Sequence, residues 1–209
     1  MQSSPMQPSL KERQRREREA LILQAAEDVF IEKGYYDTSM EEIAVRVGIA
    51  KGTIYLHFAS KEALVVAILT RDMEIFLEEL EVALATEQTA RAKLAAFLKS
   101  MHTGLRRKRN QFLSSISYQG DVRCHLSEHG HRIHELWEQM AHKVAGILEE
   151  GKAAGEFKAT LPTRMMLCAL FSLSSPHVFE RLGLEKDVPP EEFVEYVATI
   201  FFNGVQERQ

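Results

Sequence analysis

The chain has 209 residues, of which 45% are hydrophobic and 27% are charged, and its formal net charge is −4. This is enough for one large or two small domains with a buried core, and no apolar run is long enough to predict a membrane span. The N-terminus lacks a secretory core and the two cysteines, Cys124 and Cys168, are too few for a disulfide framework, so we expect a cytoplasmic protein.

The N-terminal residues 1–18 form a basic segment in a chain that is acidic overall. Its cations are Lys11, Arg13, Arg15, Arg16 and Arg18. Two interpretations remain open, a solvated and flexible leader or a basic arm that reaches nucleic-acid phosphates. From Glu19 to Lys33 apolar residues recur at helical spacing and Gly34 follows, which predicts an amphipathic helix.

The segment from Thr38 to Leu64, TSMEEIAVRVGIAKGTIYLHFASKEAL, has the pattern of two short helices joined by a turn. Ser39 is placed to cap the first helix, with Glu42 three residues later as in a capping box. Gly48 interrupts the pattern and a second helix begins near Lys51, so a short turn with glycine joins the two. This arrangement predicts a helix-turn-helix, whose second helix enters the major groove of DNA.

Polar groups on and around the second helix are the candidate DNA contacts. Lys51, Lys61 and Thr38 are predicted to contact phosphates, and Gly52 lets the backbone approach a phosphate closely. The predicted DNA-binding residues are Thr38, Ser39, Lys51, Gly52, Thr53, Tyr55, His57 and Lys61.

These motifs resemble the DNA-binding domain of the TetR family of bacterial transcriptional regulators. The resemblance is carried by Thr38-Ser39, Ile43-Ala44, Gly48-Ile49, Lys51-Gly52-Thr53, the block Tyr55-Leu56-His57-Phe58, and Ser60-Lys61-Glu62. Ala50 departs from the family, which usually has a Ser or Thr cap at this position. Alanine in place of such a cap lowers the stability of the helix by about 1 kcal/mol. The resemblance implies a homodimer with an inducer pocket in its C-terminal domain.

Helical patterns cover most of the remaining chain, and no strand pattern is present, so we predict an all-α fold. They span Ser60–Ala85, Thr89–Leu105, Phe112–Tyr118, Ser127–Ala154, Met165–Leu182, which Pro176 should kink, and Glu191–Gln206. The predicted domains are a helix-turn-helix domain over residues 19–64 and a ligand-binding and dimerisation domain over residues 65–209. The first of these helices is long enough to link the two domains.

The last two predicted helices are apolar on more than one face, which indicates burial on several sides. Core packing accounts for part of this surface, and the rest predicts a helix-bundle dimer interface. The predicted interface residues are Phe171, Val178, Phe193, Val197, Ile200 and Phe201. A two-fold dimer would present its two recognition helices about 34–36 Å apart, which fits a near-palindromic operator.

Methionine and aromatic side chains in the middle of the chain are the candidate lining of a pocket for a largely apolar small molecule. At helical spacing the same residues also fit a plain core, so the pocket rests mainly on the family resemblance. The candidates are Met101, Phe112, Ile116, Tyr118, Trp137, Met140, Met165 and Met166.

Two segments of the second half of the chain resemble sites of other chemistries. His125 and His129 share a helix face at a spacing able to bind zinc, nickel or copper, so a metal-responsive regulator is an alternative, although we predict no metal and no cofactor. Residues 146–153, GILEEGKA, lack the Ser or Thr and the preceding strand of a phosphate-binding loop. No catalytic motif is present, so we predict a ligand-responsive repressor rather than an enzyme; a helical protein-interaction module is the alternative from another class.

Overall fold

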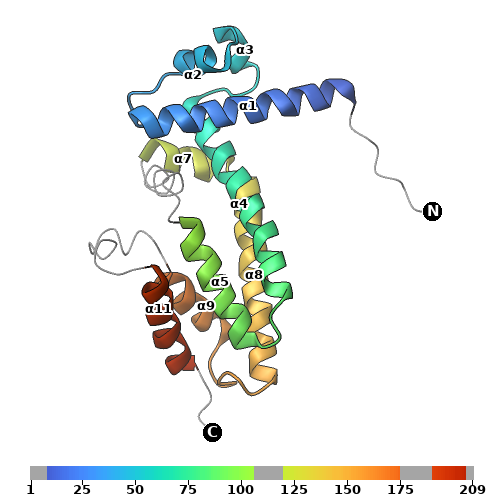
Figure 1. The fold of residues 1–209 in the computed structure, drawn as a ribbon, viewed down its shortest axis with the longest axis vertical. Helices are drawn as coiled ribbons and strands as arrows, with labels where there is room; N and C mark the ends of the chain where they lie inside the picture. The colour runs from blue at the N-terminus through green and yellow to red at the C-terminus, as the bar shows by residue number, and fades with distance from the viewer. Residues whose placement is uncertain (1–8, 106–119, 175–189, 206–209) are drawn as a thin grey trace, which may run out of the picture. The chain divides into compact units, whose positions relative to one another are not determined.

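The computed structural model describes residues 9–105, 120–174 and 190–205, and the chain divides into two compact units, Met1–Ile68 and Leu69–Gln209. The described residues form helices and no strand, which confirms the all-α prediction (Figure 1). The helices are α1 (Leu10–Lys33), α2 (Met40–Val47), α3 (Lys51–Tyr55), α4 (Lys61–Ala85), α5 (Ala90–Leu105), α7 (Gly120–His129), α8 (His131–Ala153), α9 (Thr163–Leu173) and α11 (Pro190–Val205). Among them, none is both long and apolar enough to cross a membrane.

Helix α1 begins at Leu10, well before the predicted start at Glu19. The Ser9 hydroxyl accepts the backbone N–H of Glu12 (3.3 Å), and the Glu12 carboxylate accepts the backbone N–H of Ser9 (2.7 Å). This reciprocal capping box and the strong helix formers that follow start the helix without tertiary packing. Of the two interpretations left open by the sequence, the flexible leader is therefore wrong for residues 10–18, and residues 1–8 lie outside the described chain.

The first unit is held together by apolar side chains from four helices. The fully buried ones are Ile22, Ala26, Val29 and Phe30 of α1, Ile43 of α2, Ile54 of α3, and Leu64, Val65 and Ile68 of α4. The predicted amphipathic stripe of α1 is thus confirmed, and α1 ends at Gly34 as predicted. The division between the units falls after Ile68, within α4, rather than at residue 64.

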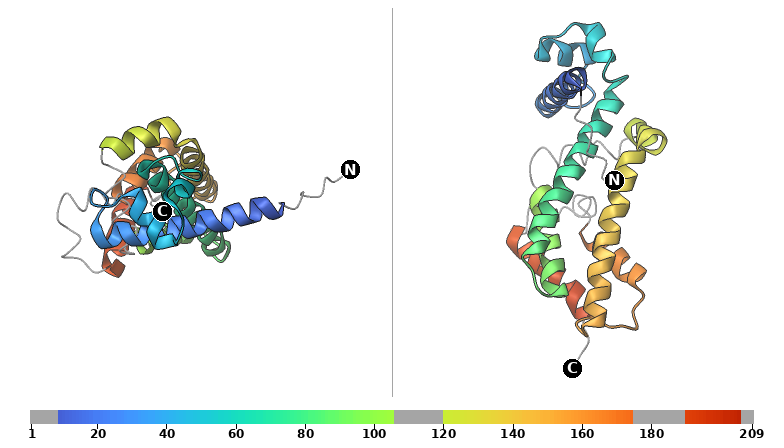
Figure 2. Two further views of the ribbon diagram at one scale, coloured as in Figure 1. Left: turned by 90° about the horizontal axis from the view of Figure 1, so that it is seen from above. Right: turned by 90° about the vertical axis from the view of Figure 1, so that its right-hand side faces the viewer.

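In the second unit, α4 and α8 run side by side in the same direction (Figure 2). Two ion pairs join them, Arg132 with Glu74 (2.8 Å) and Lys143 with Glu81. The core of this unit is formed mainly by α5, α8, α9 and α11; it includes Leu94, Phe97, Met140, Val144, Leu170, Val197 and Phe201.

The single helix predicted from Ser127 to Ala154 is broken at Gly130, where α7 ends and α8 begins. A Cβ atom on Gly130 would overlap the carbonyl oxygen of Leu126 in the last turn of α7, so the backbone at this break leaves no room for a side chain. Pro176 and the helix predicted for residues 112–118 lie outside the described residues.

Candidate nucleic-acid interface

Ser39 begins α2 as predicted. Its backbone is extended and its hydroxyl accepts the backbone N–H of Glu42 (3.2 Å). The Glu42 carboxylate contacts the ammonium of Lys33, so the other half of the predicted capping box is replaced by a contact with α1. Ser39 therefore fixes the start of α2, and Glu42 joins α2 to α1.

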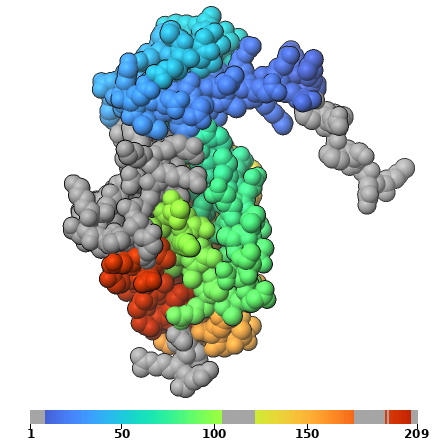
Figure 3. All heavy atoms as spheres, in the orientation of Figure 1, coloured from blue at the N-terminus to red at the C-terminus, as the bar shows by residue number. Residues whose placement is uncertain are grey.

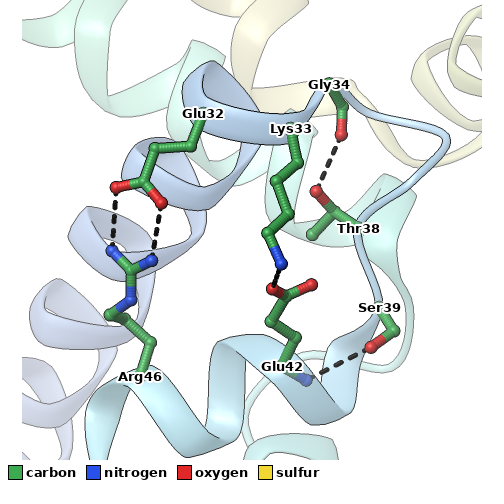
Figure 4. A network of polar contacts seen from close by, with 7 residues as sticks. All are labelled: Glu32, Lys33, Gly34, Thr38, Ser39, Glu42 and Arg46. Atoms are coloured by element: carbon green, nitrogen blue, oxygen red, sulfur yellow. Dashed lines mark hydrogen bonds and ion pairs between the residues drawn. The ribbon is translucent and has the colours of Figure 1, made fainter.

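A network of charged side chains holds α2 beside the end of α1 (Figure 4). The Arg46 guanidinium donates to both carboxylate oxygens of Glu32, at 3.1 and 2.6 Å. These bonds hold the pKa of Glu32 below its ordinary value. In the linking segment the Thr38 hydroxyl donates to the carbonyl of Gly34 (2.7 Å). The first helix of the helix-turn-helix is thus positioned by contacts at both its ends.

The turn depends on Gly48, which has the left-handed backbone (φ +77°) that a side chain disfavours. Its N–H donates to carbonyls of the last turn of α2, and the N–H of Ile49 donates to the carbonyl of Ala44 (3.0 Å). Helix α3 follows from an extended Ala50 (φ −67°, ψ 146°) that makes no side-chain cap. The predicted turn and the predicted uncapped start of α3 are both confirmed.

Lys51, Gly52 and Tyr55 lie on the exposed face of α3, and Thr53 is half-buried. Lys51 pairs with the exposed carboxylate of Glu41, which raises the pKa of the lysine. Because these groups point to solvent, this face of α3 has the geometry to enter a DNA groove.

Three other residues predicted to bind DNA are buried or bonded to groups within the protein. Thr38 is 4% exposed. The Lys61 ammonium donates to the carbonyls of Tyr35 (2.6 Å) and Thr38 (3.0 Å) and lies 4.3 Å from the centre of the Tyr35 ring. The side chain of His57 is 11% exposed, with Nδ1 3.2 Å from a carboxylate oxygen of Glu19. The Lys61 ammonium thus joins the α1–α2 segment to α4, whereas the Thr38 hydroxyl bonds within that segment, so either group would have to leave its partner to bind a phosphate.

Exposed apolar residues beside the two helices were missed by the sequence analysis. Leu56 is 79% exposed and Val45 is 78% exposed. Apolar side chains of this kind can contact thymine methyl groups in the major groove. The helical spacing could have identified Val45, because this residue does not lie on the side of α2 that carries the buried Ile43 and Ala44.

The predicted pocket residues that the structure describes differ in their exposure. Met140 and Met166 are buried in the core, whereas Trp137 is 46% and Met165 is 63% exposed. A cavity of about 10 Å³ has Met101 in its wall; its lining is Leu98, Met101, His102, Ser174, Val194 and Val197. Phe112, Ile116 and Tyr118 lie outside the described residues.

The predicted dimer residues also separate into two groups. Val197 and Phe201 are core residues of one chain, which corrects their assignment to an interface, and Phe171 packs edge-on against Phe97 at 6.0 Å. Ile200 is 60% exposed and its neighbour Tyr196 is 55% exposed. Val178 and the side chain of Phe193 lie outside the described residues.

The histidine pair lies on one face of α7 as predicted. The rings of His125 and His129 are stacked, with their centres 4.4 Å apart. Within the described ranges, no group of three or more His, Cys, Asp or Glu side chains is arranged to hold a metal ion.

Comparison with known proteins places both units among bacterial regulators. Residues 22–68 match the family described as bacterial regulatory proteins, tetR family, and residues 69–176 match the C-terminal region of YsiA-like protein. The chain is 31% identical over 159 residues to the fatty acid metabolism regulator protein of Bacillus subtilis, covering 76% of this chain and 80% of the relative. It is 37% identical over 86 residues to the transcriptional activator FasR of Mycolicibacterium smegmatis, covering 41% of this chain and 39% of FasR.

Solved structures agree with this placement. The transcriptional regulator FadR of Bacillus subtilis in complex with stearoyl-CoA has a TM-score of 0.72 and 25% identity, over 90% of this chain and 99% of that chain. The fatty acid degradation regulator FadR of Bacillus halodurans, 22% identical with a TM-score of 0.72, covers 91% of this chain and 97% of its own, and shows the same fold.

Proposed function

Since this chain belongs to the TetR family of bacterial transcriptional regulators, we propose that it represses transcription as a homodimer and leaves its operator when it binds a long-chain acyl-CoA. One observation carries the choice of ligand. The chain is 31% identical to the Bacillus subtilis fatty acid metabolism regulator over 76% of its length, which includes much of the second unit. A similar structure, at 25% identity, was solved with stearoyl-CoA.

The small cavity between residues of α5 and α11 is the candidate binding site for the acyl chain. Leu98, Met101, Val194 and Val197 give it apolar walls. Its volume of about 10 Å³ is far below the ~300 Å³ or more of a typical ligand pocket. The acyl chain must therefore push α5 and α11 apart, so the ligand favours an open state over the one described here.

Such a ligand controls DNA binding through the difference between its affinities for the two states. Helix α4 contributes residues to both units, so a displacement in the second unit is transmitted to the helix-turn-helix. Two α3 helices fit successive major-groove turns only when they are about 34–36 Å apart. To convert nearly all of the protein from the DNA-binding state to the open state, the ligand must bind the open state on the order of 10⁴-fold more tightly.

The test uses the full chain and a duplex selected from a random-sequence pool. Fluorescence anisotropy of the labelled duplex is followed while stearoyl-CoA, coenzyme A alone or stearate is added. We expect release by stearoyl-CoA and no release by coenzyme A alone. A wild-type protein that stays bound at saturating stearoyl-CoA, or that responds to zinc, nickel or copper and loses this response in His125→Ala, contradicts the proposal.

A matched pair of variants places the ligand. Val194→Trp fills the cavity, whereas Val82→Trp adds the same side chain at a 71% exposed position of α4. We expect Val194→Trp to bind the duplex without responding to stearoyl-CoA, and Val82→Trp to respond as the wild type does. If a folded Val194→Trp protein still responds to stearoyl-CoA, the acyl chain binds at another site.

A further inference from the structure

The N-terminal half of α1 is a preformed helix that nothing in the first unit covers. Every residue from 10 to 18 is exposed, and Figure 3 shows this part of the helix projecting beyond the helix-turn-helix. Its capping box at Ser9 and Glu12 and the ion pair of Arg15 with Glu19 (2.9 Å) stabilise it locally. A stiff helix of this kind holds its charged side chains in place before any partner arrives.

One face of this exposed helix carries positive charges only. Lys11, Arg15 and Arg18 lie at i, i+4 and i+7, and the same face continues one turn later as the fully buried Ile22. On the opposite face Arg13 and Arg16 alternate with Glu12 and Glu17. Like charges at these spacings destabilise a helix, so the row of three cations is unfavourable for the isolated helix and suits an anionic partner.

One member of the basic row, Arg15, is linked to the residue that follows α3. Glu19, one turn after Arg15 and bonded to it, has the same carboxylate oxygen 3.2 Å from Nδ1 of His57, which follows α3. Glu19 therefore connects Arg15 to the end of the recognition helix, within the same unit. Lys11 and Arg18 are separated by roughly 10 Å along the helix axis, a length over which duplex DNA carries several phosphates.

We propose that Lys11, Arg15 and Arg18 bind the phosphate backbone of the DNA that flanks the major groove occupied by α3. Charge complementarity and continuity with the helix-turn-helix identify duplex DNA as the occupant. These contacts add affinity and position the protein without reading sequence. The inference rests on DNA binding by the family and is independent of acyl-CoA, because it concerns the ligand-free protein.

The experiment compares two double variants that remove equal charge from opposite faces of the same turns. Lys11→Gln with Arg18→Gln removes two cations of the row, and Arg13→Gln with Arg16→Gln is the matched control. Affinity is measured against salt concentration for two duplexes, the selected site alone and the same site with one helical turn (~10 bp) of flanking DNA on each side. Circular dichroism checks that both variants keep the helicity of the wild type.

On the flanked duplex we expect the Lys11/Arg18 variant to lose roughly 2 units per protomer from the slope of log affinity against log salt, at about 0.9 per phosphate contact. The control should lose much less, and the short duplex should not distinguish the three proteins. Equal slopes for all proteins on the flanked duplex, or equal losses in both variants, would overturn the proposal. So would a loss seen only in binding to phosphatidylglycerol vesicles, which would assign the row to a membrane surface.

Discussion

At Gly52 the exposed face of α3 has no side chain, and a Cβ atom added there would have no neighbouring protein atom within 4 Å. Alanine is a better helix former than glycine by about 1 kcal/mol. We therefore expect Gly52→Ala to keep or raise the melting temperature and to weaken binding to the selected duplex, because the methyl group keeps the backbone away from DNA. Thermal melting and fluorescence anisotropy measure the two effects separately.

Gly146 provides the control for this substitution. It is an exposed glycine of α8 whose added Cβ would also meet no atom within 4 Å. Gly146→Ala should change stability in the same direction with no effect on DNA affinity. If Gly52→Ala binds DNA as tightly as the wild type does, the backbone of α3 does not approach the duplex closely.

The two lysines beside the recognition helix should respond differently to neutralisation. Lys51 is exposed, so Lys51→Gln should lower the salt slope of DNA binding by about 1 per protomer at unchanged stability. Lys61 donates to two backbone carbonyls, so Lys61→Gln should cost about 1–2 kcal/mol of unfolding free energy and leave the slope unchanged. A reduced slope with an unchanged melting temperature in Lys61→Gln would restore its predicted phosphate contact.

At the scale of elements, the segment between α1 and α2 is fastened to the first turn of α4 by a pH-sensitive contact. The Tyr35 hydroxyl donates to the Glu62 carboxylate at 2.5 Å. Burial raises the pKa of Glu62, but the bond from Tyr35, the backbone N–H, Ser60 and the charge of Lys61 together bring it below its ordinary value. A lowered carboxyl pKa contributes stability above the unfolded value of about 4.3, and this stability is lost as pH falls through the folded pKa.

Tyr35→Phe removes the hydroxyl and keeps the aromatic ring, whose centre is 5.8 Å from that of Phe30. We expect the variant to be less stable than the wild type by about 1–2 kcal/mol at neutral pH. The difference should shrink in acid, as the pH falls through the lowered pKa of Glu62 and its carboxylate becomes protonated in both proteins. Denaturant titrations across this range measure the difference, with Tyr36→Phe at a 68% exposed neighbour as the control. A gap that is independent of pH would show that the hydroxyl does not act through Glu62.

At the scale of the whole molecule, the proposed dimer requires apolar surface that one chain leaves uncovered. Helix α11 offers Tyr196 and Ile200, and α9 offers Met165, all more than half exposed. Ile200→Glu should therefore give a folded monomer with much weaker operator binding, since only the dimer presents two recognition helices. Sedimentation and circular dichroism measure assembly and folding.

Val197 is the contrasting position on the same helix. It is 4% exposed, so Val197→Glu buries a charge in the core and should unfold the second unit rather than separate the subunits. If Ile200→Glu remains dimeric at wild-type concentrations, the interface lies on another face of the second unit.

The sequence by itself determined the features that depend on neighbouring residues. Ser39 caps α2, Gly48 forms the turn, and the apolar spacing of α1 gives its buried face, because caps, turns and helix faces arise from contacts within a few residues. These features sufficed to predict the all-α fold, the helix-turn-helix and the family. The capping box at Ser9 is equally local, so the early start of α1 was available in the sequence and was overlooked.

Only the tertiary structure decided which groups remain available for a partner. Lys61 is held by Tyr35, 26 residues earlier, and His57 by Glu19, 38 residues earlier. Val197 and Ile200 are equally apolar, yet one is buried and the other exposed. A local pattern specifies the residue type and its phase on a helix, but burial and long-range hydrogen bonds depend on which elements pack together.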